Sequence, residues 1–256
     1  MIIAVCNQKG GVGKTTLATN LAYRLDPGKA LRNLVIDGDP QGNTTTVCGV
    51  ELNAKDLTLN DVLAAIATGG SGELAFQAIR EAGEKWEALD VLPADRLLAS
   101  RESDLTLGRE ARLHAAVDAI KGNYGHIVID CPPSLGMLTT NALVAADVAL
   151  IVTTAREASF DGVAEMVSTI ATVRGHYNSR LTLGGIFVNG WRADRVDRRE
   201  WADKLSDHYG QYLIEPFIPE REAIAAAATD HQPIDAKNTE INQAFEAIIG
   251  ALKEAY

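Results

Sequence analysis

The sequence predicts an α/β fold with a mainly parallel central sheet and helices on both of its faces. Short apolar runs alternate with longer amphipathic segments along the 256 residues, a rhythm typical of strand–helix alternation. Some runs are apolar throughout, as in Ile127-Val128-Ile129, which indicates strands covered on both faces. No repeat, linker or low-complexity segment divides the chain, so we expect one domain over residues 1–256.

The elements follow from hydrophobic periodicity and from the polar or glycine residues that interrupt it. The expected strands are Ile2–Cys6, Leu34–Asp37, Leu89–Leu92, His126–Asp130, Val148–Thr153, Leu183–Val188 and Leu213–Ile218. The expected helices are Lys14–Leu25, Leu59–Ala67, Asp104–Ile120, Met137–Ala146, Phe160–Arg174, Arg198–Tyr209 and Ile241–Lys253. Gly69–Gly72 is expected to be a loop.

Composition and charge exclude several classes of protein. No run of about 18 apolar residues exists, which excludes a spanning helix, and the short apolar start lacks the basic flank of a signal peptide. The three cysteines are widely spaced, so we expect neither a disulfide framework nor a CxxC site, and a reducing, cytoplasmic compartment. The net charge of −10 argues against general affinity for polyanions.

A glycine-rich run directly after the first strand predicts a phosphate-binding loop. It reads Asn-Gln-Lys-Gly-Gly-Val-Gly-Lys-Thr-Thr over residues 7–16 and opens a helix. Backbone N–H groups of such a loop surround phosphate oxygens, and the helix N-terminus adds positive potential. We expect Lys14 to reach the β- and γ-phosphates, Thr15 to bind Mg²⁺ and Thr16 to bond the α-phosphate. The alternative is a glycine-rich turn with an incidental lysine.

Carboxylates end two further strands of the predicted sheet. Asp37 and Asp39 follow the second strand, where ligands collect at the carboxyl ends of parallel strands. We expect Asp39 to orient the attacking water and Asp37 to hold a Mg²⁺-bound water. Asp130 ends an apolar strand, a Walker B pattern, and is expected to support Mg²⁺ through water. Cys131 beside it is interpreted as a structural cysteine rather than a nucleophile.

The loop departs from the common pattern, because Gln8 stands where the first glycine is usual and a second lysine, Lys9, precedes Gly10 and Gly11. This form resembles the deviant Walker A loop of the ParA/MinD superfamily, and Asp-Gly-Asp-Pro-Gln-Gly-Asn over residues 37–43 resembles its ParA branch. The resemblance implies a P-loop NTPase-like fold and a nucleotide-sandwich dimer, in which Lys9 reaches the partner's phosphates in trans. The nucleotide-binding residues so expected are Lys9, Gly10, Gly11, Val12, Gly13, Lys14, Thr15 and Thr16, with Asn189 and backbone near Pro219 at the base. An ordinary turn is the alternative for Asn189.

The similarity covers nearly the whole chain and looks like a ParA-type partition ATPase, in a short form without an N-terminal DNA-binding extension. It implies ATP and Mg²⁺ as cofactors, a homodimer joined through ATP, and a ParB-like centromere-binding partner that stimulates hydrolysis. It also implies non-specific binding to DNA by basic residues late in the chain, hence a cytoplasmic, nucleoid-associated protein. The candidate DNA-binding residues are Arg192, Arg195, Arg198, Arg199 and Arg221. A solvated arginine-rich helix start is the alternative for most of them.

Other members of the superfamily provide rival hypotheses. A MinD-like ATPase binds membranes through a C-terminal amphipathic helix, and this chain has an apolar stripe of Ile241, Ala244, Phe245, Ile248, Ile249 and Leu252. Acidic residues outnumber lysine on that helix, which disfavours anionic lipid, so we expect the stripe to pack on the core and no membrane partner. An ATPase that positions a protein cargo and a metabolic ligase also stay open. A tyrosine-rich tail and paired cluster cysteines, which other branches need, are missing.

Overall fold

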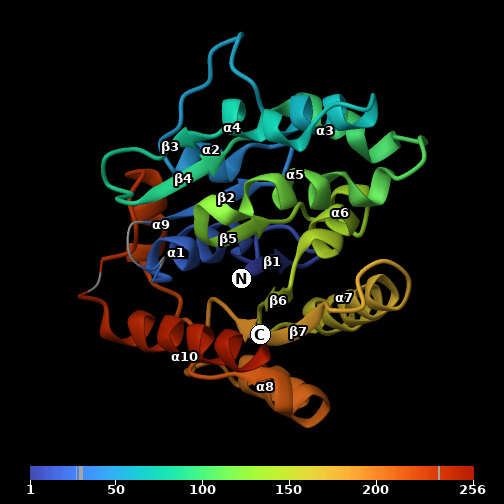
Figure 1. The fold of residues 1–256 in the computed structure, drawn as a ribbon. Helices are drawn as coiled ribbons and strands as arrows, with labels where there is room; N and C mark the ends of the chain where they lie inside the picture. Colours follow the sequence, from blue (N-terminus) through green and yellow to red (C-terminus); the bar gives the residue numbers. More distant parts are fainter. Residues whose placement is uncertain (27, 29–30, 236) are drawn as a thin grey trace.

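An eight-stranded sheet forms the centre of the molecule (Figure 1). The structure is a computed structural model and describes residues 1–26, 28, 31–235 and 237–256. The strands are β1 (Ile2–Cys6), β2 (Arg32–Asp37), β3 (Arg80–Glu81), β4 (Leu89–Leu92), β5 (Tyr124–Asp130), β6 (Val148–Thr153), β7 (Thr182–Val188) and β8 (Leu213–Ile214). Their order is β3-β4-β2-β5-β1-β6-β7-β8, and every neighbouring pair is parallel except β3 with β4.

Helices connect the strands and cover both faces of the sheet. They are α1 (Lys14–Arg24), α2 (Asn43–Val47), α3 (Leu59–Ala67), α4 (Ala75–Ala78), α5 (Arg112–Ile120), α6 (Met137–Ala145), α7 (Glu157–His176), α8 (Val196–Tyr209), α9 (Glu222–Thr229) and α10 (Thr239–Ala255). Short 3₁₀ helices span η1 (Gly72–Leu74), η2 (Arg96–Ser103), η3 (Arg109–Ala111), η4 (Lys121–Asn123) and η5 (Gly210–Tyr212). The predicted α/β class with a mainly parallel sheet is therefore confirmed.

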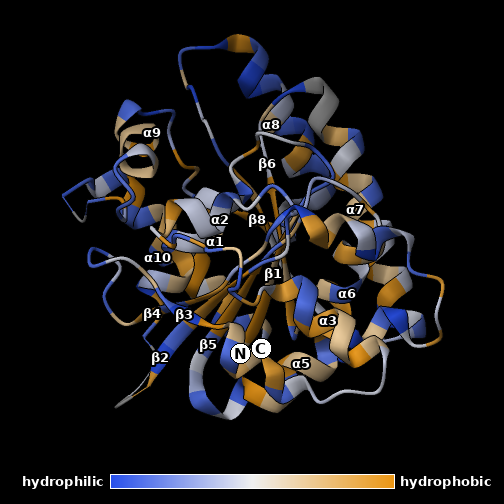
Figure 2. Cartoon of the chain, turned by 90° about the horizontal axis from the view of Figure 1, so that it is seen from above, coloured by the Kyte–Doolittle hydropathy of each residue, from blue (hydrophilic) through white to orange (hydrophobic). Residues whose placement is uncertain are grey.

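Two apolar cores lie on the two faces of the sheet. Successive residues of β1 divide between them, with Ala4 and Cys6 facing one core and Ile3 and Val5 the other, because side chains alternate along a strand. The first core is completed by residues of α3 to α8, and the second by α1 and α10 with one residue of α9. Figure 2 shows the apolar residues concentrated on the strands and the enclosed sides of the helices. Burial on both faces explains why these strands are continuously apolar.

Most predicted elements are present, and two were wrong in extent. The strand expected over Leu213–Ile218 ends at Ile214, because Pro216 has no N–H for the ladder. Beyond Pro216 the chain returns to the sheet, where Ile218 N donates to the Val188 carbonyl at 3.1 Å. The helix expected over Asp104–Ile120 starts only at Arg112, since Gly108 adopts φ 73° and interrupts it. The loop expected at Gly69–Gly72 leads into η1.

The C-terminal helix packs against the sheet as expected. In α10, Ile241, Ala244, Phe245, Ile248 and Leu252 are buried in the second core. The apolar stripe is thus occupied by contacts within the chain rather than displayed on the surface. Within the described part of the chain, no helix has both the length and the apolar character needed to cross a bilayer.

Candidate nucleotide site

The predicted site residues meet at one edge of the sheet. The phosphate loop follows β1, Asp37 ends β2, Asp130 ends β5, and Asn189 directly follows β7. In the sheet β1 lies next to β5, and β5 next to β2, with Val5 opposite Asp130 and Asp37 opposite Asp130. Parallel strands therefore bring their carboxyl ends together around the start of α1, as the sequence predicts.

Hydrogen bonds fix the phosphate loop from within. The Asn7 side-chain amide donates to the Val152 carbonyl on β6 at 2.6 Å, and its oxygen accepts from Lys9 N at 3.0 Å. The Lys14 ammonium donates to the Lys9 carbonyl at 2.9 Å, which holds it across the loop. Only 7% of Lys14 is exposed, and this burial lowers its pKa while the carboxylate of Asp130 opposes the shift.

Gly13 brings the loop and Asn189 into contact. Gly13 has φ 97°, a left-handed backbone conformation that residues other than glycine rarely adopt. A Cβ at this position would lie 2.1 Å from Asn189 Nδ2. The same amide donates to the Val12 carbonyl at 2.9 Å. The structure thus brings Asn189 to the phosphate loop from 177 residues away, beside the start of α1.

Asp130 lies at the centre of the polar groups. One carboxylate oxygen, Oδ2, accepts from the hydroxyl groups of Thr15 at 2.6 Å and Thr44 at 2.7 Å. The other, Oδ1, is buried with no hydrogen-bond partner among the described residues. Burial raises the pKa of Asp130 to about 6, with the Thr15 and Thr44 bonds and Lys14 acting against the shift. An unpartnered buried oxygen beside two hydroxyls fits a hydrated divalent cation.

Asp37 and Asp39 have different environments. Asp37 is fully buried, and its Oδ2 accepts from Thr45 N at 2.8 Å and from the Thr45 hydroxyl at 2.7 Å. Burial, and then the nearby Asp130, raise its pKa to about 7. Asp39 accepts from Gln41 N at 2.9 Å and is 8% exposed. Asp37 therefore holds the start of α2, whereas Asp39 lies in the turn before that helix.

The sequence analysis missed the threonines of α2. Thr44 contacts Asp130 and Thr45 contacts Asp37, so this short helix joins the two carboxylates. The C-terminal end of α2 is held as well, since the Trp86 indole N–H lies 3.2 Å from the Val47 carbonyl and 3.0 Å from that of His231. The available signal was the run Asn43-Thr44-Thr45-Thr46 directly after the Asp-Pro-Gln-Gly turn, because hydroxyl side chains are typical partners of carboxylates and Mg²⁺.

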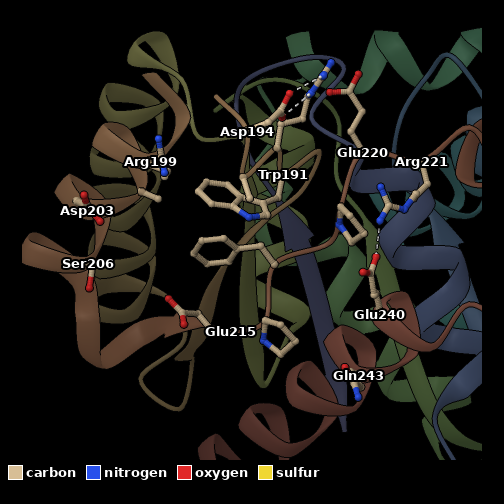
Figure 3. A pocket seen from close by; sticks show the side chains of 16 residues that line it. Trp191, Asp194, Arg199, Asp203, Ser206, Glu215, Glu220, Arg221, Glu240 and Gln243 are labelled. Carbon is tan, nitrogen blue, oxygen red and sulfur yellow. Dashed lines mark hydrogen bonds and ion pairs between the residues drawn. The ribbon is translucent and has the colours of Figure 1, made fainter. Parts of the chain in front are cut away.

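Pro219, predicted near the base, and three of the candidate DNA-binding arginines line a separate cavity (Figure 3): Arg192, Arg199 and Arg221. The cavity measures about 970 Å³ and is lined by residues of α8, α10 and the chain around Trp191 and Pro219. The Trp191 and Phe217 rings pack edge to face with centroids 5.1 Å apart. Pro219 pairs with Trp191 in an isolated bridge and lines this cavity, which has no phosphate-loop residue in its wall.

Three of the five candidate arginines are in ion pairs with carboxylates. Arg192 pairs with Asp194 at 3.1 Å, Arg221 with Glu240 at 2.6 Å and Arg198 with Asp197 at 3.7 Å. Arg195 and Arg199 are exposed and have no ion pair with any residue that the structure describes. The structure therefore separates the candidates into three neutralised side chains and two available ones.

Comparison with known proteins identifies the family. A family model described as an AAA domain matches residues 1–183. The chain is 35% identical to the chromosome partitioning protein ParA of Caulobacter vibrioides, covering 91% of this chain and 85% of that protein. It is also 35% identical to the sporulation initiation inhibitor protein Soj of Bacillus subtilis, covering 91% and 89%.

A solved structure gives a second line of comparison. The cobyrinic acid a,c-diamide synthase of Mycobacterium smegmatis, crystallised with bound ADP and magnesium, is 29% identical with a TM-score of 0.75. The match covers 90% of each chain. The relatives match this chain over most of its length, and they agree with the phosphate loop and its second lysine. The chain therefore belongs to the ParA-type partition ATPases of the ParA/MinD superfamily.

Proposed function

We propose that this protein is a Mg²⁺-dependent ATPase whose ATP-bound dimer is the active state of a DNA-partition switch. The observation that carries the proposal is the Asp130 carboxylate, buried beside the phosphate loop with one oxygen on Thr15 and Thr44 and the other unpartnered. This arrangement suits a hydrated cation next to a phosphate chain. The relative solved with ADP and magnesium supports the same pair of ligands here.

Each residue has a distinct task in this proposal. The backbone of residues 10–13 and the Lys14 ammonium would bind the phosphates, and the hydroxyls of Thr15 and Thr44 would hold the cation. Asp130 and Asp37 would hold its water molecules. Mg²⁺, when bound, neutralises negative charge on the phosphates. Asp39 would orient the attacking water, and Asn189 and the backbone near Pro219 would contact the base.

Lys9 is the residue that distinguishes a dimeric switch from an ordinary ATPase. It is half-buried in the phosphate loop, and its carbonyl rather than its ammonium bonds Lys14. We propose that its ammonium crosses to the phosphates of a second copy, where it would stabilise the ATP-bound dimer and the transition-state charge.

Substitution of Lys9 tests this step. Lys9→Ala should remove ATP-dependent dimerisation, measured by light scattering after chromatography with ATP and Mg²⁺, and leave the melting temperature of the monomer within about 2 °C. Lys55→Ala, which removes an exposed lysine elsewhere, is the matched control and should dimerise normally. A Lys9→Ala protein that dimerises like the control would contradict the sandwich mechanism.

The proposed cellular role rests on the ParA and Soj relatives. The ATP-bound dimer would bind DNA without sequence preference, with Arg195 and Arg199 as the available cations, and so associate with the nucleoid. A ParB-like partner would stimulate hydrolysis and release. Retention on arbitrary duplex DNA that requires ATP and decreases steeply with salt is the experiment that tests this role.

The likeness to the cobyrinic acid a,c-diamide synthase supports a second candidate, an ATP-dependent amide ligase. The two candidates differ in what accelerates hydrolysis. DNA and a protein partner should stimulate a partition ATPase, whereas a ligase should respond to a carboxylic acid and an amine donor. Measuring phosphate release with each addition separates them.

A further inference from the structure

Residues 94–102 form a segment that contacts both sides of the nucleotide site. The segment follows β4 and includes most of η2. At its start, Ala94 N donates to the Thr45 hydroxyl at 3.1 Å, and that hydroxyl donates to Asp37 at 2.7 Å. In its middle, Leu98 is fully buried in the first core. The start of the segment is therefore attached, through Thr45, to the carboxylate that ends β2.

The end of the same segment is attached to the chain after Asp130. Glu102 Oε2 accepts from Met137 N, the first residue of α6, at 2.6 Å, and Oε1 lies 3.4 Å from the Ser134 hydroxyl. The helix has no side-chain cap of its own, since glycine occupies the N-cap position. A carboxylate at a helix N-terminus satisfies a free N–H group and interacts favourably with the helix dipole. Glu102 thus supplies the cap from a distant segment.

The chain that Glu102 holds is the one between Asp130 and α6. Within it, Pro133 packs toward the phosphate loop, with its Cβ 3.9 Å from where a Cβ of Gly10 would lie. Ser134 O accepts from the Thr139 hydroxyl at 2.8 Å, which ties this stretch to the first turns of α6. A shift of the α6 start would therefore displace Pro133, which lies beside Gly10 of the phosphate loop.

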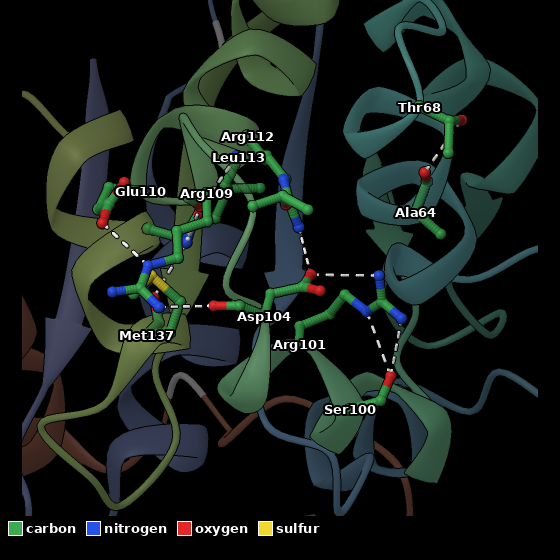
Figure 4. A network of polar contacts seen from close by, with 12 residues as sticks. Ala64, Thr68, Ser100, Arg101, Asp104, Arg109, Glu110, Arg112, Leu113 and Met137 are labelled. Carbon is green, nitrogen blue, oxygen red and sulfur yellow. Dashed lines mark hydrogen bonds and ion pairs between the residues drawn. The ribbon is translucent and has the colours of Figure 1, made fainter.

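The far end of the segment is anchored to α5. Asp104 lies between Arg101, at 3.2 Å, and Arg112, an α5 side chain only 5% exposed (Figure 4). Asn141 of α6 also contacts this region through Leu113 N at 3.0 Å and the Arg109 carbonyl at 2.8 Å. The segment is thus fixed to an ion pair in which Arg112 is buried and Asp104 is partly exposed, so it can transmit a displacement rather than absorb it.

We propose that the 94–102 segment couples the α2 side of the nucleotide site to the stretch after Asp130, with Glu102 as the positioning residue. This inference rests on the proposed ATPase function. A change at Thr45, such as one brought about by MgATP at Asp37 and Thr44, would be passed through Ala94 and η2 to Glu102, and from there to Ser134 and Met137. Glu102 would act on the reaction only through the chain it holds.

A substitution at Gly136 can also break the contact between Glu102 and the start of α6. A Cβ at Gly136 would lie 2.3 Å from Glu102 Oε2, and the backbone of Gly136, with φ −80°, accepts alanine. Gly136→Ala should therefore displace the carboxylate without changing it. Glu102→Ala removes the carboxylate that a Cβ at Gly136 would meet, and it also removes the cap of α6. Glu102→Ala and Gly136→Ala therefore form a double-mutant cycle.

The test compares Glu102→Ala, Glu102→Gln, Gly136→Ala and the double variant with Glu87→Ala, an exposed glutamate, as control. For ATP hydrolysis we expect kcat to fall about 10-fold in Glu102→Ala and Gly136→Ala, with KM for MgATP changed less than about 2-fold, since the effect is one of positioning. The double variant should be no slower than Glu102→Ala. Glu102→Gln keeps an acceptor oxygen and should lie between wild type and Glu102→Ala.

Hydrogen exchange provides a readout that does not depend on turnover. In wild-type protein MgATP should slow exchange in residues 94–104, and Glu102→Ala should lose that protection. Without nucleotide, exchange at residues 137–140 should be faster in Glu102→Ala than in Glu87→Ala. Multiplicative kcat losses in the double variant, or MgATP protection of 94–104 that survives Glu102→Ala, would overturn the coupling.

The two proposals fail separately. If wild-type protein neither binds nor hydrolyses ATP, the proposed function is wrong, and the nucleotide-free exchange at 137–140 still decides whether Glu102 holds the start of α6. If wild type hydrolyses ATP and the Glu102 variants match Glu87→Ala, only the coupling is wrong.

Discussion

The nucleotide edge of the sheet and the arginine-rich surface around α8 differ in how their charged side chains are buried and paired. At the nucleotide edge, Lys14, Asp37 and Asp130 are buried, and most of their polar atoms have a defined partner. Around α8 most charges are exposed, with Arg198 the mostly buried exception, and Arg192 and Arg221 are paired with nearby carboxylates. Burial requires each charged group to have a partner, whereas an exposed charge is stable with or without one.

This difference determines what each region reveals about function. The unpartnered oxygen of Asp130 is informative because a buried polar atom without a partner is rare. An arginine such as Arg199, with no ion pair among the described residues, is ordinary on a surface, so DNA binding there is a question for the salt dependence of affinity.

Lys14→Ala should produce the largest loss. Removing the buried Lys14 ammonium should lower kcat for ATP hydrolysis by at least about 100-fold, because this ammonium would stabilise charge in a site shielded from water. Phosphate release under saturating MgATP measures the effect. Activity within a few-fold of wild type would show that the loop lysine is not part of the reaction.

Asp130→Asn should lower Mg²⁺-dependent activity less than Lys14→Ala does, and yet stabilise the metal-free protein at neutral pH. Burial raises the pKa of Asp130 to about 6. The folded state therefore binds this proton more tightly than the unfolded state, and the carboxyl lowers the free energy of unfolding as pH rises from about 4 to 6. The Asp130→Asn variant does not have this loss of stability. Its melting temperature should therefore exceed that of the wild type by several degrees at pH 8 and by little at pH 4.5.

The control for this prediction is Asp203→Asn, an exposed carboxylate on α8. Thermal melts in EDTA at the two pH values should show no comparable pH-dependent gain for Asp203→Asn. A melting difference for Asp130→Asn that does not grow with pH would mean that ionised Asp130 carries no penalty in the folded state.

The combined change of Arg195 and Arg199 to alanine should have the smallest effect. Loss of two phosphate contacts should weaken ATP-dependent DNA binding about 10-fold and reduce the slope of log affinity against log salt by about 2. Arg221→Ala should change binding less, because Glu240 already neutralises this arginine. Fluorescence anisotropy over a salt series measures the affinity of both variants for DNA. Equal losses of affinity in the Arg195 and Arg199 double variant and in Arg221→Ala would contradict the distinction between available and paired arginines.

Local motifs predicted the fold and named residues that the structure brings together at one edge of the sheet, and long-range contacts account for what the motifs missed. The loop at residues 7–16 and the strands before Asp37 and Asp130 follow from short patterns, because chain direction in a parallel sheet brings their ends together. Glu102 escaped detection, since its partner Met137 lies 35 residues away and Glu102 belongs to no short motif. The ion pairs of Arg192 and Arg221 depend on side-chain geometry that spacing does not specify.

The position of β1 in the middle of the sheet has a consequence for biosynthesis. The phosphate loop is translated well before β5 and β6, the neighbours of β1, which end at residues 130 and 153. The bond from Thr15 to Asp130 spans 115 residues, and the bond from Asn189 to Val12 spans 177. A growing chain therefore cannot complete this site until Asn189 has been translated, so a product truncated before that residue would lack a finished nucleotide site.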